Sequence, residues 1–387
     1  MKPRDLWIVL ILFILGVVGL IYAKTEPYGN SLSALIGIWE GFYEINPNLV
    51  DPQFVIYSSG GYDGQFFYLL AKDLFADEKW DLIVDSFYFR YHRIGLSFAS
   101  GTLSLLFGSA NYPILTLILL FSVFIFSVYC LYELLPKNSK WLVLFYIVSP
   151  YSLNANLLLV ADSFFVSLAL IAYYFYSKEK HFLAFLFFFF TVFTRELGIL
   201  FLAPIGLQFL LKKNWKLLLL YSIPGILFIV FIIYGWVATP NHLGTNPLGF
   251  RDMTDYPLFG FAKSFIENGS FHFKIKEFPK LLFLFSFFVV CYLCFSSLRQ
   301  PSLQKLEILL PILGSLLVIA IAEEGYWRSF DNLSRMFTLI LPFSILLIED
   351  KKNIGLKLFL TSSALLFFFL LIRILFITPK KEYFLAI

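Results

Sequence analysis

The long apolar runs constrain this chain more than any other feature of its sequence. Two of them contain "LLFLFSFFVVCYLCF" and "LLFFFLLIRILFI". Such runs approach or exceed the roughly 20 apolar residues that cross a bilayer as a helix. Only 14% of the 387 residues are charged, whereas a soluble domain carries about a quarter. The runs also lack the apolar–polar alternation of a membrane barrel. We therefore predict an all-α, polytopic membrane protein.

The hydropathy pattern predicts about ten to twelve transmembrane helices in one integral-membrane domain, residues 1–387. The expected spans are 6–22, 94–108, 113–135, 141–176 and 182–211 as two broken pairs, 216–237, 280–298, 304–322, 336–349 and 356–376. If 136–140 lies on the same side as the N-terminus, 94–135 must cross an odd number of times, and the sequence does not decide how.

Lysine and arginine indicate the orientation of the chain. They concentrate in the short loops at 177–181, 212–216, 299–305 and 349–357 and at the N-terminus. Such loops are typical of the cytoplasmic side, so we expect a multi-pass protein of the inner (plasma) membrane, surrounded by membrane lipids. Residues 23–93 then form a large first extracytoplasmic loop. No basic block indicates nucleic-acid binding.

Asp63 is the principal candidate in this loop. It precedes 64–75, whose periodicity predicts a helix lying in the membrane interface. One interpretation is that Asp63 caps this helix. The other is that its carboxylate removes a proton from an attacking hydroxyl or holds a cation. The two roles are compatible.

Basic residues at the end of the loop suggest an anionic partner. Arg90 and Arg93 flank His92, and on a helix continuing into 94–108 both arginines would point the same way. Arginine binds phosphate oxygens bidentately. The alternative is that they snorkel to the interface as anchors. Arg335, at the start of a later span, is also placed for a phosphate.

Other charged residues interrupt apolar runs. Asp162, Arg195 and Glu196 are expected at the outer level, where a charge usually faces a cavity or a partner. Arg195 and Glu196 could instead pair with each other. Arg373 lies deep in the final span, without a partner identifiable from the sequence.

Several short motifs resemble those of the GT-C superfamily of membrane glycosyltransferases, in particular bacterial proteins of cell-surface glycopolymer formation. They are "GGYDGQFFY" at 60–68, "AKD" at 71–73, "DSFYFRYHR" at 85–93, "ADSFFVSLAL" at 161–170 and "TREL" at 194–197. The resemblance covers roughly the first 200 residues. The chain departs from the pattern at Leu74, where a proline is frequent, and after Arg93, where "IGLS" replaces a Tyr-Pro type entry to the next span.

The resemblance implies transfer of a sugar from a polyprenyl-phosphate donor to a glycan or lipid acceptor on the extracytoplasmic face. Asp63 would be the catalytic acidic residue, with Glu26 as runner-up. The implied substrate-binding residues are Tyr62, Gln65, Asp85, Arg90, His92, Arg93, Asp162, Arg195 and Glu196. We add Arg335, which lies beyond the resemblance, for its position at the start of a later span. Some relatives need a divalent cation such as Mg²⁺ or Mn²⁺ and others do not.

Two other functions remain open on the sequence. A surface-polysaccharide polymerase also uses arginine-rich outer loops. A flippase for lipid-linked sugars needs charges along a path through the bilayer. Few charged residues lie in the middle of the predicted spans, which favours an enzyme.

Overall fold

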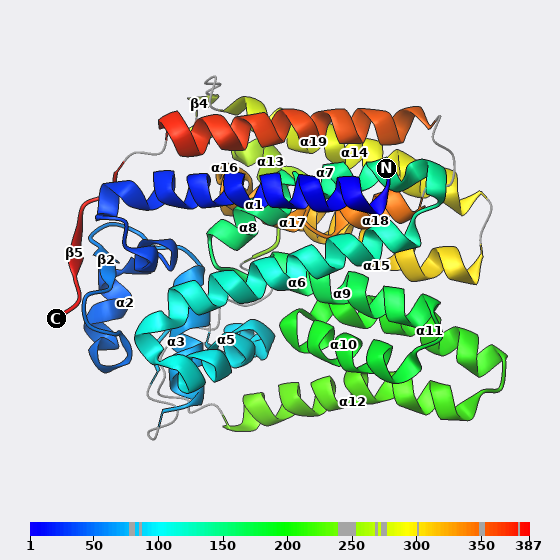
Figure 1. Cartoon of the computed structure of the whole chain (residues 1–387), viewed down its shortest axis with the longest axis horizontal. Helices are drawn as coiled ribbons and strands as arrows, with labels where there is room; N and C mark the ends of the chain where they lie inside the picture. The colour runs from blue at the N-terminus through cyan, green and yellow to red at the C-terminus, as the bar shows by residue number, and fades with distance from the viewer. Residues whose placement is uncertain are drawn as a thin grey trace.

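The structure is a computed structural model. It describes residues 1–76, 82–84, 87–238, 253–267, 270–271, 277–299, 302–347, 353–377 and 380–387. Helices running along one axis make up most of it (Figure 1). Within the described residues, seven helical segments are long and apolar enough to cross a membrane, and three shorter ones are also apolar. The prediction of an all-α polytopic membrane protein is confirmed.

The longest helices run through most of the molecule's length (Figure 1). They are α1 (Pro3–Thr25), α6 (Tyr112–Leu134), α12 (Trp215–Ala238), α14 (Phe278–Leu298), α15 (Leu303–Ile321) and α19 (Ile354–Ile372). Many of their side chains face outward and are apolar, as lipid contact requires. Helix α19 continues into a π-helical turn, η10 (Arg373–Ile377).

Two sets of shorter helices share the remaining length (Figure 1). One set is α9 (Ala161–Ser177), α10 (His181–Thr194) and α11 (Ile199–Leu211), and the other is α3 (Gly64–Leu74) and α5 (Ile94–Phe107). Helix α10 has 14 residues and is about 21 Å long, less than the roughly 30 Å of a bilayer core. Each set of short helices therefore covers only part of the molecule's length.

The start of α5 touches the end of α10. A Cβ added at Gly95 would lie 2.3 Å from Oγ1 and 3.0 Å from Cα of Thr194. Only glycine allows this approach, because any larger residue would push the two helix ends apart. Residues 94–107 therefore form a short helix beside α3, and α6 is the helix that traverses the molecule. Residues 94–135 thus traverse the molecule once, the odd number needed if 136–140 lies on the same side as the N-terminus.

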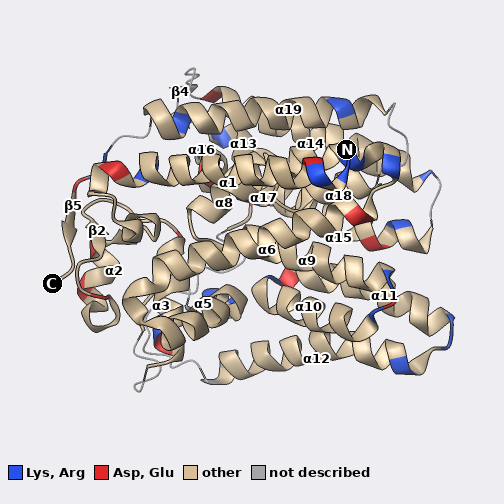
Figure 2. Ribbon diagram, in the orientation of Figure 1, with Lys and Arg blue, Asp and Glu red and all other residues tan. Residues whose placement is uncertain are grey.

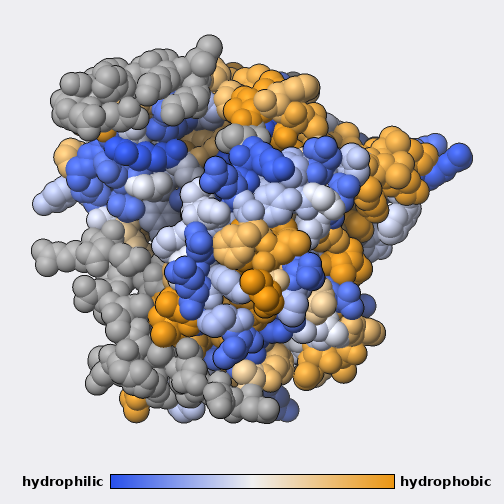
Figure 3. All heavy atoms as spheres, turned by 90° about the vertical axis from the view of Figure 1, so that its left-hand side faces the viewer, coloured by the Kyte–Doolittle hydropathy of each residue, from blue (hydrophilic) through white to orange (hydrophobic). Residues whose placement is uncertain are grey.

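The two ends of the molecule differ. We call the end that holds residues 26–76 the loop end and the opposite end the basic end. Lysine and arginine gather at the basic end, in the turns between α9 and α10 and between α11 and α12 (Figure 2). Seen from the loop end, hydrophilic residues gather over the face and hydrophobic ones on its flank (Figure 3).

A small sheet holds the loop end together. Strand β2 (Val55–Tyr57) pairs in parallel with β1 (Ile38–Trp39) and antiparallel with β5 (Tyr383–Leu385), near the end of the chain. Before β1 lie η1 (Glu26–Tyr28) and η2 (Leu32–Leu35), and between β1 and β2 lie α2 (Glu40–Ile45) and η3 (Pro47–Leu49). Helix α3 packs against α5, and most of its side chains are buried. The helix predicted at 64–75 is present, but it is enclosed by protein on most of its surface.

The remaining elements connect these parts. They are α4 (Phe87–Tyr91), η4 (Ser109–Asn111), η5 (Lys137–Leu142), α7 (Val143–Ile147), α8 (Pro150–Leu157), η6 (Glu196–Gly198), α13 (Phe259–Lys263), β3 (Ile266–Glu267), β4 (Ser270–Phe271), α16 (Glu324–Arg328), α17 (Phe330–Met336) and α18 (Ile340–Leu347).

Candidate functional site

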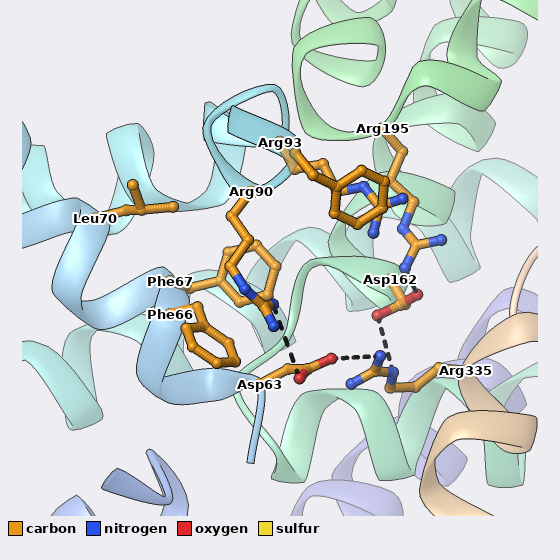
Figure 4. Close-up of a pocket in the computed structure, with 10 residues that line it drawn as sticks. Asp63, Phe66, Phe67, Leu70, Arg90, Arg93, Asp162, Arg195 and Arg335 are labelled. Carbon is orange, nitrogen blue, oxygen red and sulfur yellow. Dashed lines mark ion pairs between the residues drawn. The ribbon is translucent and has the colours of Figure 1, made fainter. Parts of the chain in front are cut away.

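A pocket lies where the two sets of short helices meet (Figure 4). It contains about 350 Å³ of space, with the open solvent at its mouth included. Four arginines and two aspartates line it on one side, and four apolar side chains form the rest of the wall. The lining residues are Asp63, Phe66, Phe67, Leu70, Phe89, Arg90, Arg93, Asp162, Arg195 and Arg335.

The charged side chains project from helix ends. Asp63 directly precedes α3, and Asp162 lies in the first turn of α9. Arg195 directly follows α10, and Arg335 lies in the last turn of α17. Carboxylates are favoured at the positive N-terminal end of a helix and guanidinium groups at the negative C-terminal end. The helix dipoles therefore stabilise these four charges where they stand.

Arg335 bridges the two aspartates. Its Nη2 lies 2.6 Å from a carboxylate oxygen of Asp63, and its Nε lies 3.5 Å from one of Asp162. Asp162 also pairs with Arg195. The Asp162 side chain is 4% exposed, so its charge is tolerated in the interior because two arginines compensate for it.

The other two arginines lie against aromatic rings. The guanidinium of Arg90 is 3.2 Å from the ring centroid of Phe66 and 3.9 Å from a carboxylate oxygen of Asp63. That of Arg93 is 4.2 Å from the ring of Phe89. Arg93 also donates two hydrogen bonds to Glu196, at 2.7 and 3.2 Å. The rings hold the guanidinium planes in place by cation–π attraction.

Arginines outnumber carboxylates among the described residues of the pocket. There are four arginines and three carboxylates, counting Glu196 on Arg93. Burial by itself raises the pKa of the Asp63 carboxyl, but Arg335, Arg90 and Arg93 outweigh it and lower the pKa to about 2. Asp63 is therefore ionised at physiological pH. Fixed guanidinium groups beside an apolar wall suit an anion that carries an apolar or sugar group.

Six predicted site residues meet in this pocket, namely Asp63, Arg90, Arg93, Asp162, Arg195 and Arg335. Glu196 reaches it through Arg93. Asp85 lies outside the described residues.

Three other predicted site residues are not among those that line the pocket. The side-chain oxygen of buried Gln65 accepts a hydrogen bond from the backbone N–H of Trp39. Tyr62 packs against the buried cluster of Ala155, Leu158 and Val160. His92 is half-buried, and burial lowers its pKa to about 4.

The structure also decides between several interpretations of single residues. Asp63 occupies the N-cap position, but its side chain makes no capping hydrogen bond. Arg90 and Arg93 do not lie on one continuous helix, because α4 ends at Tyr91 and α5 begins at Ile94. Arg195 and Glu196 pair with Asp162 and Arg93 instead of with each other.

Glu26, the runner-up for the acidic role, is exposed on η1 and is not a lining residue of the pocket.

Some residues near the site were not singled out by the sequence. The phenol of Tyr326 interacts electrostatically with Arg93, Asp63 and Arg335, and burial raises its pKa. Phe66, Phe67 and Phe89 form the wall. The chain has 49 phenylalanines, so no local signal marks these three. Only the fold brings them together.

The charged groups of the pocket do not form a metal site on their own. Within the described residues, no group of three or more His, Cys, Asp or Glu side chains is placed to hold a metal ion. Asp63 and Asp162 already face guanidinium groups. Mg²⁺ and Mn²⁺ require several oxygen ligands, so these residues do not fit the divalent cation that the sequence left open.

The fold and the pocket together define a polytopic α-helical membrane protein with an arginine-rich pocket between its short helices. No protein-family model matches the chain, and no curated protein or solved structure matches it significantly.

Proposed function

We propose that the protein is a membrane glycosyltransferase of the GT-C type, which transfers a sugar from a polyprenyl-phosphate donor to a glycan or lipid acceptor of the cell envelope. The observation that carries this proposal is the convergence of four arginines and an ionised aspartate in one pocket with an aromatic wall. The guanidinium groups suit the phosphate, and the aromatic side suits the sugar and the first isoprene unit.

The distribution of charge supports an extracytoplasmic reaction. Lysine and arginine gather in the turns of the basic end. By the positive-inside rule this end faces the cytoplasm. The loop end then faces outward, in the inner (plasma) membrane. The pocket is lined from the α3 and α5 side by Asp63, Phe66 and Arg93, so an acceptor reaches it from outside the cell.

The reaction is a direct displacement with inversion. Asp63 removes the proton from an acceptor hydroxyl, and the hydroxyl oxygen bonds to the anomeric carbon. The bond from that carbon to the phosphate oxygen breaks, and polyprenyl phosphate leaves. Arg90, Arg93 and Arg335 stabilise the negative charge that develops on the phosphate, where fixed charges are most effective.

Donor binding prepares Asp63 for its role. A carboxylate with a pKa of about 2 is a weak base. A bound phosphate takes over part of the pairing of Arg335 and Arg90, which are the largest charges lowering this pKa. The pKa of Asp63 then rises, and the base is stronger in the complex than in the free protein.

The test is sugar transfer from a polyprenyl-phosphate sugar in membranes that contain Asp63→Asn. We expect a loss of about a hundredfold or more, because a general base contributes about 10²–10⁴ to the rate. Glu44→Gln is the matched control, since Glu44 is an exposed acid of the same loop. Undiminished transfer by folded Asp63→Asn protein contradicts the proposal.

The same assay separates the enzyme from its rivals. A glycosyltransferase consumes a monosaccharide linked to polyprenyl phosphate. A polymerase requires an oligosaccharide repeat on a diphosphate carrier, and a flippase releases no polyprenyl phosphate. Use of a repeat unit alone, or translocation without cleavage of the sugar–phosphate bond, assigns the protein to one of those classes.

A further inference from the structure

A second charged cluster lies on the other side of the loop from the arginine pocket. Its centre is the ring of Tyr62, the neighbour of Asp63. The ammonium of Lys24 is 5.8 Å from the ring centroid, and that of Lys381 is 4.8 Å from it. Arg373 also interacts electrostatically with Tyr62. These residues come from α1, the loop, the end of α19 and the C-terminal segment, so only the fold brings them together.

The cluster has more cations than anions. Asp331 is its carboxylate, and both of its oxygens accept hydrogen bonds from Arg373, at 2.5 and 2.7 Å. Lys24 and Lys381 also interact electrostatically with Asp331. Among the described residues, three cations thus surround one carboxylate. Charges at such a depth usually face a partner or a cavity, and this arrangement suits an anion.

Lys24 points into the protein. A lysine at a helix end usually extends its ammonium toward water. Here Nζ donates a hydrogen bond of 2.8 Å to the backbone carbonyl of Leu157, at the end of α8. In the described part of the chain this is its one hydrogen bond. An ammonium has three N–H donors, so Lys24 retains capacity for an inward-facing anion.

Lys381 is fixed in a similar way. Its Nζ donates to the carbonyl oxygens of Ser59 and Gly60, at 3.3 and 2.7 Å. These bonds use two of its three donors and hold the ammonium above Tyr62. The cluster is therefore pre-ordered, and a ligand would lose little entropy in arranging it.

The surroundings of the cluster are those of a lipid contact. Helix α1 and η10 contact each other, and basic residues mark the loop ends of α1 and α19 in Figure 2. Beside them, apolar side chains face outward. Tyr22 is 60% exposed and Phe376 is 81% exposed. Arg373 opens a π-helical turn, a distortion that is frequent at functional sites.

We propose that the loop ends of α1 and α19 bind the phosphate of an anionic membrane lipid. Lys24, Lys381 and Arg373 contact the phosphate, and the acyl chains lie against the exposed residues of η10. Asp331 orients Arg373 toward this site. The site does not depend on the proposed glycosyltransferase function.

This lipid site is distinct from the arginine pocket but adjoins it. Tyr62 faces the lipid site and Asp63 the pocket. On α17, Asp331 belongs to the lipid site and Arg335 to the pocket, four residues apart. A lipid bound at the cluster therefore stabilises both the loop before α3 and helix α17, which carry the Asp63–Arg335 ion pair of the pocket.

The test measures lipid retention by the full chain. Protein purified in a mild detergent is exposed to phosphatidylglycerol or phosphatidylcholine, and native mass spectrometry counts the bound molecules. We expect phosphatidylglycerol to be preferred. In Lys24→Met/Lys381→Met its affinity should fall about thirtyfold, which corresponds to two lost cation–phosphate contacts. Lys380→Met is the matched control, because Lys380 is exposed and neighbours Lys381.

Three results overturn the proposal. They are equal retention of the two lipids by the wild-type protein, unchanged retention by the double variant, and an equal loss in Lys380→Met. A further arm adds inorganic phosphate to lipid-free protein. If inorganic phosphate stabilises the protein against heat as strongly as phosphatidylglycerol does, the site binds free phosphate and the lipid assignment is wrong. If the double variant does not fold, Lys381→Met alone is measured.

Discussion

The bridge made by Arg335 gives a quantitative test of the pocket. In Arg335→Met, Asp63 and Asp162 lose the guanidinium group that lies 2.6 Å from one and 3.5 Å from the other. The Arg335 side chain is 11% exposed, so the change removes a charge from a largely buried position. The two carboxylates are then only partly compensated, Asp162 by Arg195 and Asp63 by Arg90.

The expected loss follows from the burial of the two carboxylates. Breaking a buried ion pair costs about 3–5 kcal/mol, because a charge is left without its partner. The Asp63 side chain is 35% exposed, so solvent weakens the contribution of its ion pair with Arg335. Asp162 is buried but keeps Arg195. We therefore expect the free energy of unfolding to fall by about 2–3 kcal/mol.

The measurement is denaturant unfolding of the purified protein in detergent, near neutral pH. A double-mutant cycle adds Asp162→Asn and the combination with Arg335→Met. Because the two residues interact directly, the double variant should be less destabilised than the sum of the single ones, by about 1–2 kcal/mol.

Arg328→Met is the control. Arg328 lies one helix earlier, is 46% exposed and pairs with Glu324 at 3.7 Å. Exposed pairs contribute about 0–1 kcal/mol. Equal losses in the Arg335 and Arg328 variants, or a coupling energy near zero, refute the assignment of Arg335 as the bridge.

Three further predictions concern acid sensitivity and packing. The pKa of Asp63 lies below its ordinary value of 3.8, at about 2. The ion pairs of Asp63 therefore stabilise the fold above pH 4, and this stabilisation is lost between about pH 4 and 2. Asp63→Asn should flatten that part of a stability–pH curve, and an unaltered curve contradicts this. The pKa of His92 is lowered from 6.5 to about 4, so the unfolded chain binds the extra proton and stability falls from pH 6.5 toward 4; His92→Gln should remove this fall, as measured by thermal unfolding. Gly64→Ala places a Cβ 2.5 Å from the carbonyl oxygen of Leu158 and should lower the free energy of unfolding by about 1–3 kcal/mol. Gly19→Ala is the control, because a Cβ there meets nothing within 4 Å and should not destabilise the protein. Similar melting temperatures for the two variants refute the tight contact at Gly64.

The class of fold could be predicted from the sequence because lipid imposes a simple rule. Apolar runs such as 113–135 must become helices, since no water satisfies their backbone groups. Helix α6 accordingly begins and ends within one residue of that prediction. The helix predicted at 94–108 is present as α5 (94–107), but its contact with the end of α10 at Thr194 could not be predicted, because it depends on the packing of distant segments.

Part of the pocket could be predicted because charges in apolar runs are costly and indicate a cavity or a partner. This reasoning led to Asp162 and Arg195, which the structure pairs. The individual partners could not be predicted, because they join different segments of the chain, such as those that carry Arg93 and Glu196, 103 positions apart. Arg373 had no partner identifiable from the sequence for the same reason: Asp331 lies 42 residues away.

The pairing of β5 with β2 has a consequence for biosynthesis. Residues 383–385 leave the ribosome long after β2, yet they form one edge of the sheet that holds the segment before Asp63. That segment emerges early and must wait, without its neighbouring strand, until α19 is in place and β5 has reached the loop end. A chain stalled before that point would already be anchored in the bilayer but would still lack an organised pocket.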